Sequence, residues 1–278
     1  MPRFSASCGT IYIALASFLM TASAAAFEPL IDHFDTPADK PDAALWSTII
    51  GPGSFLGDTQ LDPWTARAES HFPAANGALR LTVESFNPSG FSWWGKHIQS
   101  RREFQPTADT AIEITFRMRI VGDFTGVVHS GYLYGCRDPA TCATRHDEID
   151  LEVIKGRDGV ATLVANVYAD EPLGLGRPIH MTPAGWDPAA FNDYRITWSR
   201  TKIAFHLNGR LLTTYDATRG AVPIGPMQFN AIAWVPSEEA YARVYSPLRR
   251  PTRDPATSEV FAAEIDAVSV REVSTVAE

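Results

Sequence analysis

Three acidic side chains alternate with apolar ones in the segment HDEIDLEVIKG, residues 146–156. Glu148, Asp150 and Glu152 occupy every second position, a pattern that is typical of a half-buried β-strand. Residues two apart share one face of a strand, so the three carboxylates are expected to lie side by side. Like charges at neighbouring positions repel, and Thr or Lys would serve a merely wet face at lower cost. We therefore expect this face to carry a function.

Hydrolysis of a glycosidic bond requires the groups that this strand offers. In a retaining glycosidase one carboxylate attacks the anomeric carbon, and one carboxylic acid protonates the departing oxygen. A negative neighbour raises the pKa of a carboxyl group, so crowding keeps one of the acids protonated at neutral pH. We expect Glu148 to be the nucleophile and Glu152 the acid/base, while Asp150 tunes the proton affinity and hydrogen-bonds the nucleophile.

The reach of the two glutamates sets a condition on the strand. Four residues of extended chain span about 13 Å between Cα atoms, whereas retaining enzymes hold their carboxyl groups about 5–5.5 Å apart. The side chains must therefore lean together, which is easier on the concave face of a curved sheet. Two other interpretations of the same residues stay open: an acidic surface strand, or a calcium site made from carboxylates.

Short alternating segments throughout the chain predict further strands, whereas helical periodicity is scarce. Residues 194–198 and 203–207 indicate a hairpin, and Asn208-Gly209 supplies a tight turn into residues 210–215. Other strands are expected at residues 78–84, 111–118 and 263–270. Many short strands with Gly and Pro turns favour an all-β sandwich or barrel of roughly 200–250 residues, which we expect to form a single domain over residues 27–278.

The first 26 residues have the pattern of a secretory signal peptide. Arg3 gives the positive start, Ile11 to Met20 form a mostly apolar run, and small residues precede Phe27. An uncleaved membrane anchor is the alternative, but the run is shorter than the roughly 20 residues that a spanning helix needs. We expect residues 1–26 to be removed and the mature protein to be secreted, to the extracellular space or the periplasm, with no membrane association.

The charge balance bears on the class of partner. The chain has 24 basic and 32 acidic side chains, a formal net charge of −8, whereas a nucleic-acid partner demands a basic footprint. A neutral or weakly charged substrate suits this balance. The seven Trp, eight Tyr and fifteen Phe include candidate rings for a sugar site, because the axial C–H bonds of a pyranose form an apolar surface.

Two of the three cysteines, Cys136 and Cys142, remain once Cys8 leaves with the signal peptide. Exported proteins meet oxidising conditions, so this pair is expected to form a disulfide across a small loop. The pair alone makes a poor zinc site, because two further ligands at standard spacing are missing. The loop comes just before Glu148, and fixing it is the expected role of the disulfide.

The motif HDEIDLE, residues 146–152, resembles the signature of glycoside hydrolase family 16. Its form without an inserted residue is similar to that of lichenases and plant xyloglucan endotransglycosylase/hydrolases. The resemblance implies a β-jelly-roll sandwich of two antiparallel sheets, of the concanavalin A-like lectin/glucanase type. It also implies retention of the anomeric configuration and the same roles for Glu148, Asp150 and Glu152.

Weaker likenesses to the same family follow in order along the chain. They lie at Ile98–Arg101, which resembles a substrate-face strand, and at Asn166–Tyr168, Phe191–Trp198, Asn208-Gly209 and Asn230–Trp234. Residues 104–110 and the cysteine loop depart from lichenases. These departures leave the chemistry intact and concern the choice of polysaccharide.

Eight residues are candidate sugar contacts: Trp93, Trp94, Gln99, Tyr132, His146, Asn166, Tyr168 and Trp234. Trp93 and Trp94 precede the expected substrate-face strand, and one of them should be exposed because neighbours on an extended chain face opposite ways. Each candidate has a structural alternative, which is core packing for the rings and a buried hydrogen bond for the polar groups. Asp147 faces away from the three acids and is given no catalytic role.

These observations predict a secreted, endo-acting, retaining glycoside hydrolase acting on a polysaccharide, with a β-glucan, 1,3-1,4-linked first, as the leading substrate. A transglycosylase with the same chemistry and a non-catalytic, lectin-like carbohydrate-binding protein are the alternatives. Lectins on such a sandwich usually lose one of the paired acids, and both are present here. We expect a monomer without cofactor or catalytic metal, although a structural calcium ion is compatible with the fold.

Overall fold

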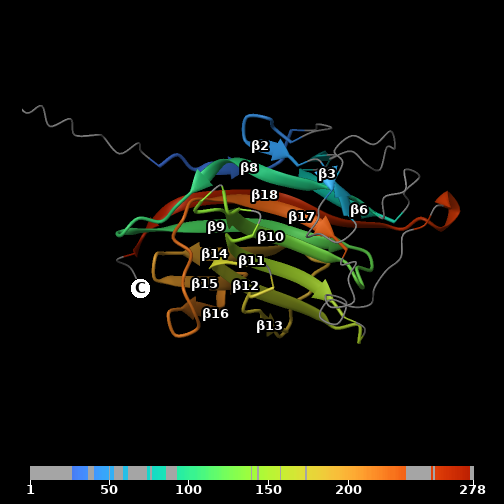
Figure 1. The fold of residues 1–278 in the computed structure, drawn as a ribbon. Coiled ribbons are helices and arrows are strands. Elements are labelled where there is room, and N and C mark those ends of the chain that lie inside the picture. The colour runs from blue at the N-terminus through green and yellow to red at the C-terminus, as the bar shows by residue number, and fades with distance from the viewer. Residues whose placement is uncertain are drawn as a thin grey trace, which may run out of the picture.

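The computed structural model describes residues 27–36, 41–49, 51–52, 59–61, 74–75, 77–85, 93–138, 140–142, 144–156, 158–172, 174–235, 252 and 254–275. The predicted signal peptide lies outside these residues. The described chain is built almost entirely from strands, which form two stacked sheets (Figure 1). A single short 3-10 helix, η2 (Pro255–Thr257), is present within the described ranges.

The larger sheet, called sheet A, contains β1 (Leu30–Asp32), β3 (Gly51–Pro52), β4 (Thr59–Leu61), β5 (Ala74–Ala75), β6 (Ala78–Glu84), β7 (Trp93–Gly95), β9 (Thr110–Val121), β14 (Asn192–Trp198), β15 (Lys202–Leu207), β16 (Arg210–Asp216) and β18 (Val260–Ser274). Its order is β16-β15-β14-β9-β18-β6-β7-β4-β3, with β1 paired to β18 and β5 to β6. All of these pairs are antiparallel except β4 with β7.

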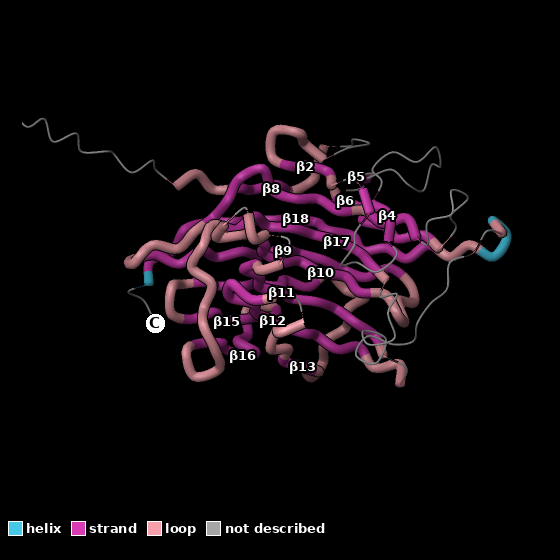
Figure 2. The backbone as a smooth tube through the Cα atoms, viewed as in Figure 1, coloured by secondary structure: helices cyan, strands magenta, loops and turns pink. Residues whose placement is uncertain are grey.

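The smaller sheet, called sheet B, contains β2 (Trp46–Thr48), β8 (His97–Phe104), β10 (Val128–Gly135), β11 (His146–Lys155), β12 (Ala161–Glu171), β13 (Ile179–Met181) and β17 (Met227–Trp234). Its order is β13-β12-β11-β10-β17-β8-β2, and every pair is antiparallel. The acidic strand β11 therefore lies inside the sheet, between β10 and β12 (Figure 2). The expected all-β jelly-roll sandwich of two antiparallel sheets is confirmed.

The main hydrophobic core fills the space between the sheets. On β11 the alternate residues Ile149, Leu151 and Val153 are fully buried in this core. The sheets approach closely at Gly131 of β10, where a Cβ atom would lie 2.5 Å from the ring of Phe116 on β9. The core therefore takes up the apolar side of the acidic strand and leaves its carboxylates on the opposite side of sheet B.

The local predictions agree with the structure. The predicted hairpin is β14 and β15, and the turn into β16 places Asn208 at φ 50° and Gly209 at φ 78°. Both residues of a type I′ turn need positive φ, which is why Asn-Gly serves there. The predicted disulfide between Cys136 and Cys142 is present, with 5.2 Å between the Cα atoms, in the connection from β10 to β11.

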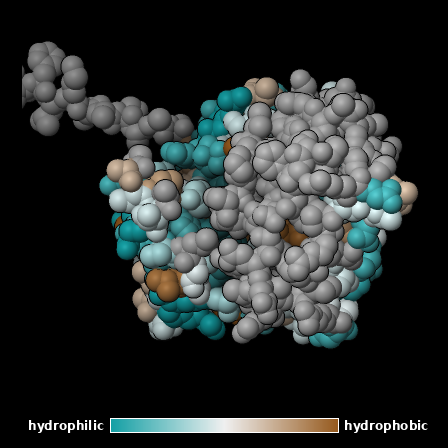
Figure 3. All heavy atoms as spheres, turned by 45° about the vertical axis from the view of Figure 1, so that its right-hand side comes forward, coloured by the Kyte–Doolittle hydropathy of each residue, from teal (hydrophilic) through white to brown (hydrophobic). Residues whose placement is uncertain are grey.

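On the face that Figure 3 shows, the coloured part of the surface is mostly hydrophilic, with isolated apolar spots. Its exposed large apolar side chains are scattered along the chain: Ile31, Val160, Leu175, Leu211 and Val260. Across the described part of the chain, we find no helix whose length and apolar character would let it cross a membrane.

Candidate active site

The three acids of β11 share the face of sheet B that points away from the core. The side chain of Glu148 is 15% exposed, while Asp150 and Glu152 are 5% and 7% exposed. The predicted alternation is therefore confirmed. Each acid stands at the centre of a row of side chains that crosses the sheet, because neighbouring strands lie only about 4.8 Å apart.

Asp150 lies in a polar row that extends over five strands. It pairs with Asn166 of β12 on one side and with Tyr132 of β10 on the other. Tyr132 pairs with Asn230 of β17, and Asn230 pairs with Gln99 of β8. Gln99 Nε2 donates a hydrogen bond to Asn230 Oδ1 (3.1 Å), and Asn166 hydrogen-bonds Asp150. Three predicted sugar contacts therefore lie in line with the central acid.

Glu148 is surrounded by aromatic rings. It pairs with Tyr134 of β10 and Tyr168 of β12. The ring of His146 lies against both tyrosines, with centroid distances of 5.2 Å and 4.8 Å. His146 Nε2 is 2.8 Å from Glu148 Oε2, although the angles are not those of a hydrogen bond. Burial lowers the pKa of His146, so a neutral imidazole lies against the carboxyl group of Glu148.

Glu152 lies beside an apolar patch on the same face. It pairs with Ser130 of β10 and Val164 of β12. A second hydrophobic cluster on this face consists of Val128, Tyr132, Ile154, Val164, Ile232 and Trp234. Trp234 pairs with Val128 and therefore belongs to the Glu152 end of the face. The two ends differ: histidine and tyrosines adjoin Glu148, and an apolar wall adjoins Glu152.

A hydrogen-bonded pair, His97 and Asn230, supports Tyr132. Asn230 Nδ2 donates to the carbonyl oxygen of Gln228 (2.9 Å), so its Oδ1 is an acceptor. His97 Nε2 lies 2.9 Å from that Oδ1 and 3.2 Å from the Tyr132 hydroxyl, which places the imidazole proton on Nε2. Burial lowers the pKa of His97 to about 4, and the ring is neutral at neutral pH.

Burial and mutual repulsion set the protonation of the acids. Burial raises the pKa of Glu148 to about 8, a hydrogen bond from Asp150 lowers it, and the charge of Glu152 raises it. Burial raises the pKa of Asp150 well above its usual range, and both the charge of Glu148 and their shared hydrogen bond raise it further. Because the pKa of Asp150 is raised further than that of Glu148, Glu148 is the first of the pair to ionise, and its carboxylate then accepts a hydrogen bond from Asp150. Burial is the main cause that raises the pKa of Tyr132, and the charges of Glu148, Asp150 and Glu152 raise it further. The Tyr132 hydroxyl group is therefore near all three acids.

Four of the predicted sugar contacts differ from the others in sheet or in accessibility. Trp93 and Trp94 belong to β7, which is in sheet A rather than sheet B, and their side chains lie outside the described part of the structure. Asn166 and Tyr168 face the acids but are covered by the backbone at Gly176, where a Cβ atom would lie 2.6 Å and 2.5 Å from their side chains.

Tyr134 and Asn230 lie on the same face as the acids but are not among the eight predicted sugar contacts. Asn230 shares the parity of the predicted contact Trp234 on the same strand, and Tyr134 that of Tyr132, which is the signal that could have found them. No group of three or more His, Cys, Asp or Glu side chains suited to a metal ion occurs among the residues that the structure describes.

Comparison with known proteins gives the family. The model of the family described as "Glycosyl hydrolases family 16" matches residues 63–245, more than half of the chain. The endo-1,3-1,4-beta-glycanase ExoK of Rhizobium meliloti (strain 1021) is 26% identical over 206 residues, which are 73% of this chain and 67% of that protein. Xyloglucan endotransglucosylase protein 6 of Diospyros kaki is 25% identical over 141 residues, 50% of this chain, and the match spans only 40% of that protein.

Several solved structures with a similar fold are β-glucanases. A β-1,3-1,4-glucanase (lichenase) derived from a mouse hindgut metagenome has a TM-score of 0.64 at 18% identity, covering 88% of this chain and 99% of that chain. The endo-β-1,3-glucanase from Pyrococcus furiosus has a TM-score of 0.66 at 17% identity, covering 88% and 94%. These identities, 18% and 17%, speak for the fold alone, and the family match identifies the family. The chain therefore belongs to glycosyl hydrolases family 16 and is a glycoside hydrolase related to β-glucanases.

Proposed function

We propose that this protein is a secreted, monomeric, endo-acting β-glycanase that hydrolyses a β-glucan with retention, with 1,3-1,4-linked glucan as the first substrate. One observation carries the proposal. Strand β11 presents three carboxyl groups on one face, and Glu148 and Asp150 hydrogen-bond each other. A carboxylate beside a second acid on one strand meets the needs of a two-step retaining reaction.

Each acid has one role in this reaction. The Glu148 carboxylate attacks the anomeric carbon while the carboxylic acid of Glu152 gives its proton to the leaving oxygen, which yields a glycosyl ester on Glu148. Glu152, now a carboxylate, takes a proton from water, and the water oxygen attacks the anomeric carbon and releases Glu148. Asp150 hydrogen-bonds Glu148 and stabilises it both as nucleophile and as leaving group.

The polar row favours a neutral sugar. Gln99, Asn230 and Tyr132 offer amide and hydroxyl groups, which suit sugar hydroxyls, and none of them carries a positive charge for an acidic glycan. ExoK is named as an endo-1,3-1,4-beta-glycanase. The two solved neighbours are named for 1,3-1,4- and 1,3-linked β-glucans, which supports a glucan. Secretion rests on the signal-like residues 1–26.

A transglycosylase is the second candidate, because the Diospyros kaki relative is an endotransglucosylase. In that case a sugar hydroxyl replaces water in the second step. Incubation with a β-glucan and a labelled oligosaccharide acceptor separates the two: label in a longer product indicates transfer, and reducing ends without label indicate hydrolysis. Binding to glucans without release of reducing ends would indicate the lectin-like alternative.

The acids provide the direct test. E148A and E152A should each lower the hydrolysis rate on barley β-glucan by about 100-fold or more, because each removes a group that acts in the transition state. Reducing-sugar assays on barley glucan, laminarin, xyloglucan and agarose measure the rate and rank the substrates, and circular dichroism checks that the variants are folded.

Stereochemistry gives an independent reading. Proton NMR of fresh product should show the β-anomer first, because two displacements restore the configuration. A near-normal rate in either variant, or an α-anomer appearing first, would reject the assignment.

A further inference from the structure

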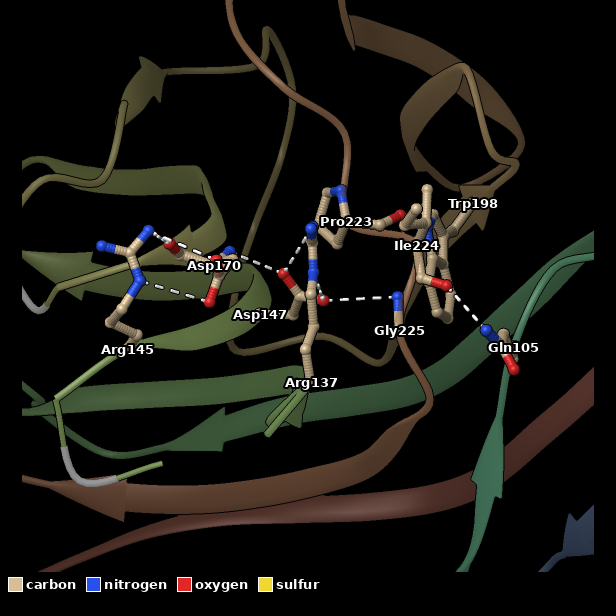
Figure 4. Close-up of polar contacts among 9 residues, drawn as sticks. All are labelled: Gln105, Arg137, Arg145, Asp147, Asp170, Trp198, Pro223, Ile224 and Gly225. Atoms are coloured by element: carbon tan, nitrogen blue, oxygen red, sulfur yellow. Dashed lines mark hydrogen bonds and ion pairs between the residues drawn. The ribbon is translucent and has the colours of Figure 1, made fainter. Parts of the chain in front are cut away.

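Asp147 is a buried carboxylate that the reaction described above does not use. It directly precedes Glu148 on β11, points toward the interior between the sheets, and its side chain is 1% exposed. Figure 4 shows it at the centre of a network of polar contacts. Burying a carboxylate costs free energy unless it is well paired and hydrogen-bonded, so groups around Asp147 must compensate this cost.

Four N–H groups converge on the Asp147 carboxylate. Arg137 donates through Nη2 to Oδ1 (3.1 Å) and through Nε to Oδ2 (3.0 Å). The backbone N–H of Asp170 donates to Oδ1 (2.7 Å), and that of Gly225 donates to Oδ2 (3.3 Å). Each oxygen therefore accepts two hydrogen bonds, and the donors come from three separate segments of the chain.

One of these segments is a β-bulge at the start of the catalytic strand. His146 pairs with Glu171 but Asp147 pairs with Ala169, so Asp170 is the extra residue of β12. Asp170 has φ 55°, in the left-handed region, and its N–H is the one that Asp147 accepts. A bulge bends its strand and increases the local twist. Asp147 therefore stabilises the β-bulge at Asp170. This bulge lies next to His146, whose ring contacts Glu148.

A second segment, residues 223–225, leads into β17. Pro223 and Ile224 are held through their carbonyl oxygens, which accept hydrogen bonds from Trp198 Nε1 and Gln105 Nε2 (2.8 Å each) (Figure 4). At Gly225 a Cβ atom would lie 2.8 Å from Asp147 Oδ2, so only glycine allows this approach. The third segment is the disulfide loop after β10, which carries Arg137.

We propose that Asp147 is a positioning residue for the nucleophile Glu148. Its hydrogen bonds connect the start of β11 to the loop after β10, the end of β12 and the segment before β17. These three strands carry the residues that surround Glu148 and Asp150. This inference rests on the proposed function. Placement matters because a shift of about 1 Å at a reacting group can cost about 100-fold in rate.

D147N is a sharp test, since it keeps the shape of the side chain. An amide has one acceptor oxygen and one NH2 group, and each position of the carboxylate faces two donors. Whichever way the new amide turns, two N–H groups oppose its NH2. We expect kcat on β-glucan to fall about tenfold or more at a temperature where the variant is folded, with KM within about twofold.

A leaving-group comparison separates nucleophile placement from acid catalysis. The dinitrophenolate of a dinitrophenyl β-glycoside is a leaving group that needs no protonation. Cleavage of this substrate therefore still requires Glu148 but not the proton of Glu152. The loss in D147N should persist with this substrate, whereas the loss in E152A should largely disappear from the first step.

E264Q is the matched control. Glu264 on β18 of sheet A is a largely buried carboxylate, 17% exposed, that accepts hydrogen bonds from Arg80 (3.1 Å) and Arg119 (2.8 Å). E264Q should lower the melting temperature and leave kcat unchanged. A folded D147N with wild-type kcat, or with a loss no larger than that of E264Q, would overturn the proposal.

R137K covers the case in which D147N does not fold. It keeps the charge at Arg137 but removes the paired hydrogen bonds. It should show the same pattern with a smaller loss of about threefold, and unchanged kcat would count against the inference. Failure of the proposed function looks different: the wild-type protein would hydrolyse no β-glucan, or E148A would remain active, whatever D147N does.

Discussion

At the scale of single residues, the site binds protons more tightly than the unfolded chain does. The pKa of Glu148 is raised by burial to about 8, and that of Asp150 is raised further above its usual value. Between the ordinary value of a glutamate, about 4.3, and about 8, the folded state holds the proton more tightly. This contribution to stability is complete below the ordinary value and is lost as the pH rises toward 8. The reaction, in contrast, needs Glu148 ionised.

E148Q should therefore be more stable than the wild-type protein while inactive. Gln cannot ionise and can still accept the hydrogen bond from Asp150. At pH 7 we expect the free energy of unfolding to rise by roughly 1–3 kcal/mol, and by less at pH 5, where the wild-type group is closer to neutral in both states. Urea unfolding at the two pH values measures the difference. An equal change at both values would show that ionisation of Glu148 is not the cause.

At the scale of elements, the site depends on the contact between the two sheets as well as on β11. Strand β10 supplies Ser130, Tyr132 and Tyr134 to the catalytic face, and Gly131 lies among them on the opposite face. The absence of a side chain at Gly131 lets the ring of Phe116 on β9 pack directly on the strand backbone. Gly131 pairs with Leu151, so the spacing of the sheets is fixed between the rows that contain Asp150 and Glu152.

G131A tests this contact. Its Cβ atom would lie 2.5–2.8 Å from three atoms of the Phe116 ring, so the ring or the strand must move. We expect a loss of about 1–3 kcal/mol in the free energy of unfolding, typical of overpacking. F116L should relieve the clash, and in a double-mutant cycle G131A should cost less in the F116L background. Strictly additive losses would mean that the ring does not limit this position.

At the scale of the whole molecule, buried histidines oppose the acids in their dependence on pH. Burial lowers the pKa of His97 to about 4 and that of His129 to about 3. The stability that comes from their neutral forms is present above the ordinary value of about 6.5 and is lost as the pH falls through the lowered values. Glu148 acts in the other direction, so stability should be greatest at mildly acidic to neutral pH.

H129L tests the acid side of this balance. His129 is fully buried on the core face of β10 near Phe124, and neither ring nitrogen has a hydrogen-bond partner among the described residues. Leu removes an unpaired polar group and a group that must stay neutral, so we expect the free energy of unfolding to rise by about 1 kcal/mol at pH 7 and by more at pH 5. Denaturant titration at both pH values measures it. A gain that does not grow at pH 5 would exclude His129 as a source of acid sensitivity.

Features that depend on near neighbours along the chain could be predicted from local sequence patterns. Alternation along residues 146–153 placed Glu148, Asp150 and Glu152 on one face, because successive side chains of a strand point in opposite directions. The same rule placed Asp147 on the other face, and Asn208-Gly209 set the turn because these residues tolerate positive φ. The strands and the disulfide followed from equally local signals.

Contacts between side chains from distant strands could not be predicted in this way, because they depend on how the strands pair and pack. Parity assigns a residue to a face, but the register between strands distant in sequence decides what lies opposite it, as with Asn230 and Gln99 beside Tyr132. The tertiary structure also places the backbone of Trp93 and Trp94 in sheet A rather than sheet B. It brings Gly225, 78 residues away in sequence, to the carboxylate of Asp147. Such contacts arise from hydrogen-bond ladders and sheet packing, which no short stretch of sequence contains.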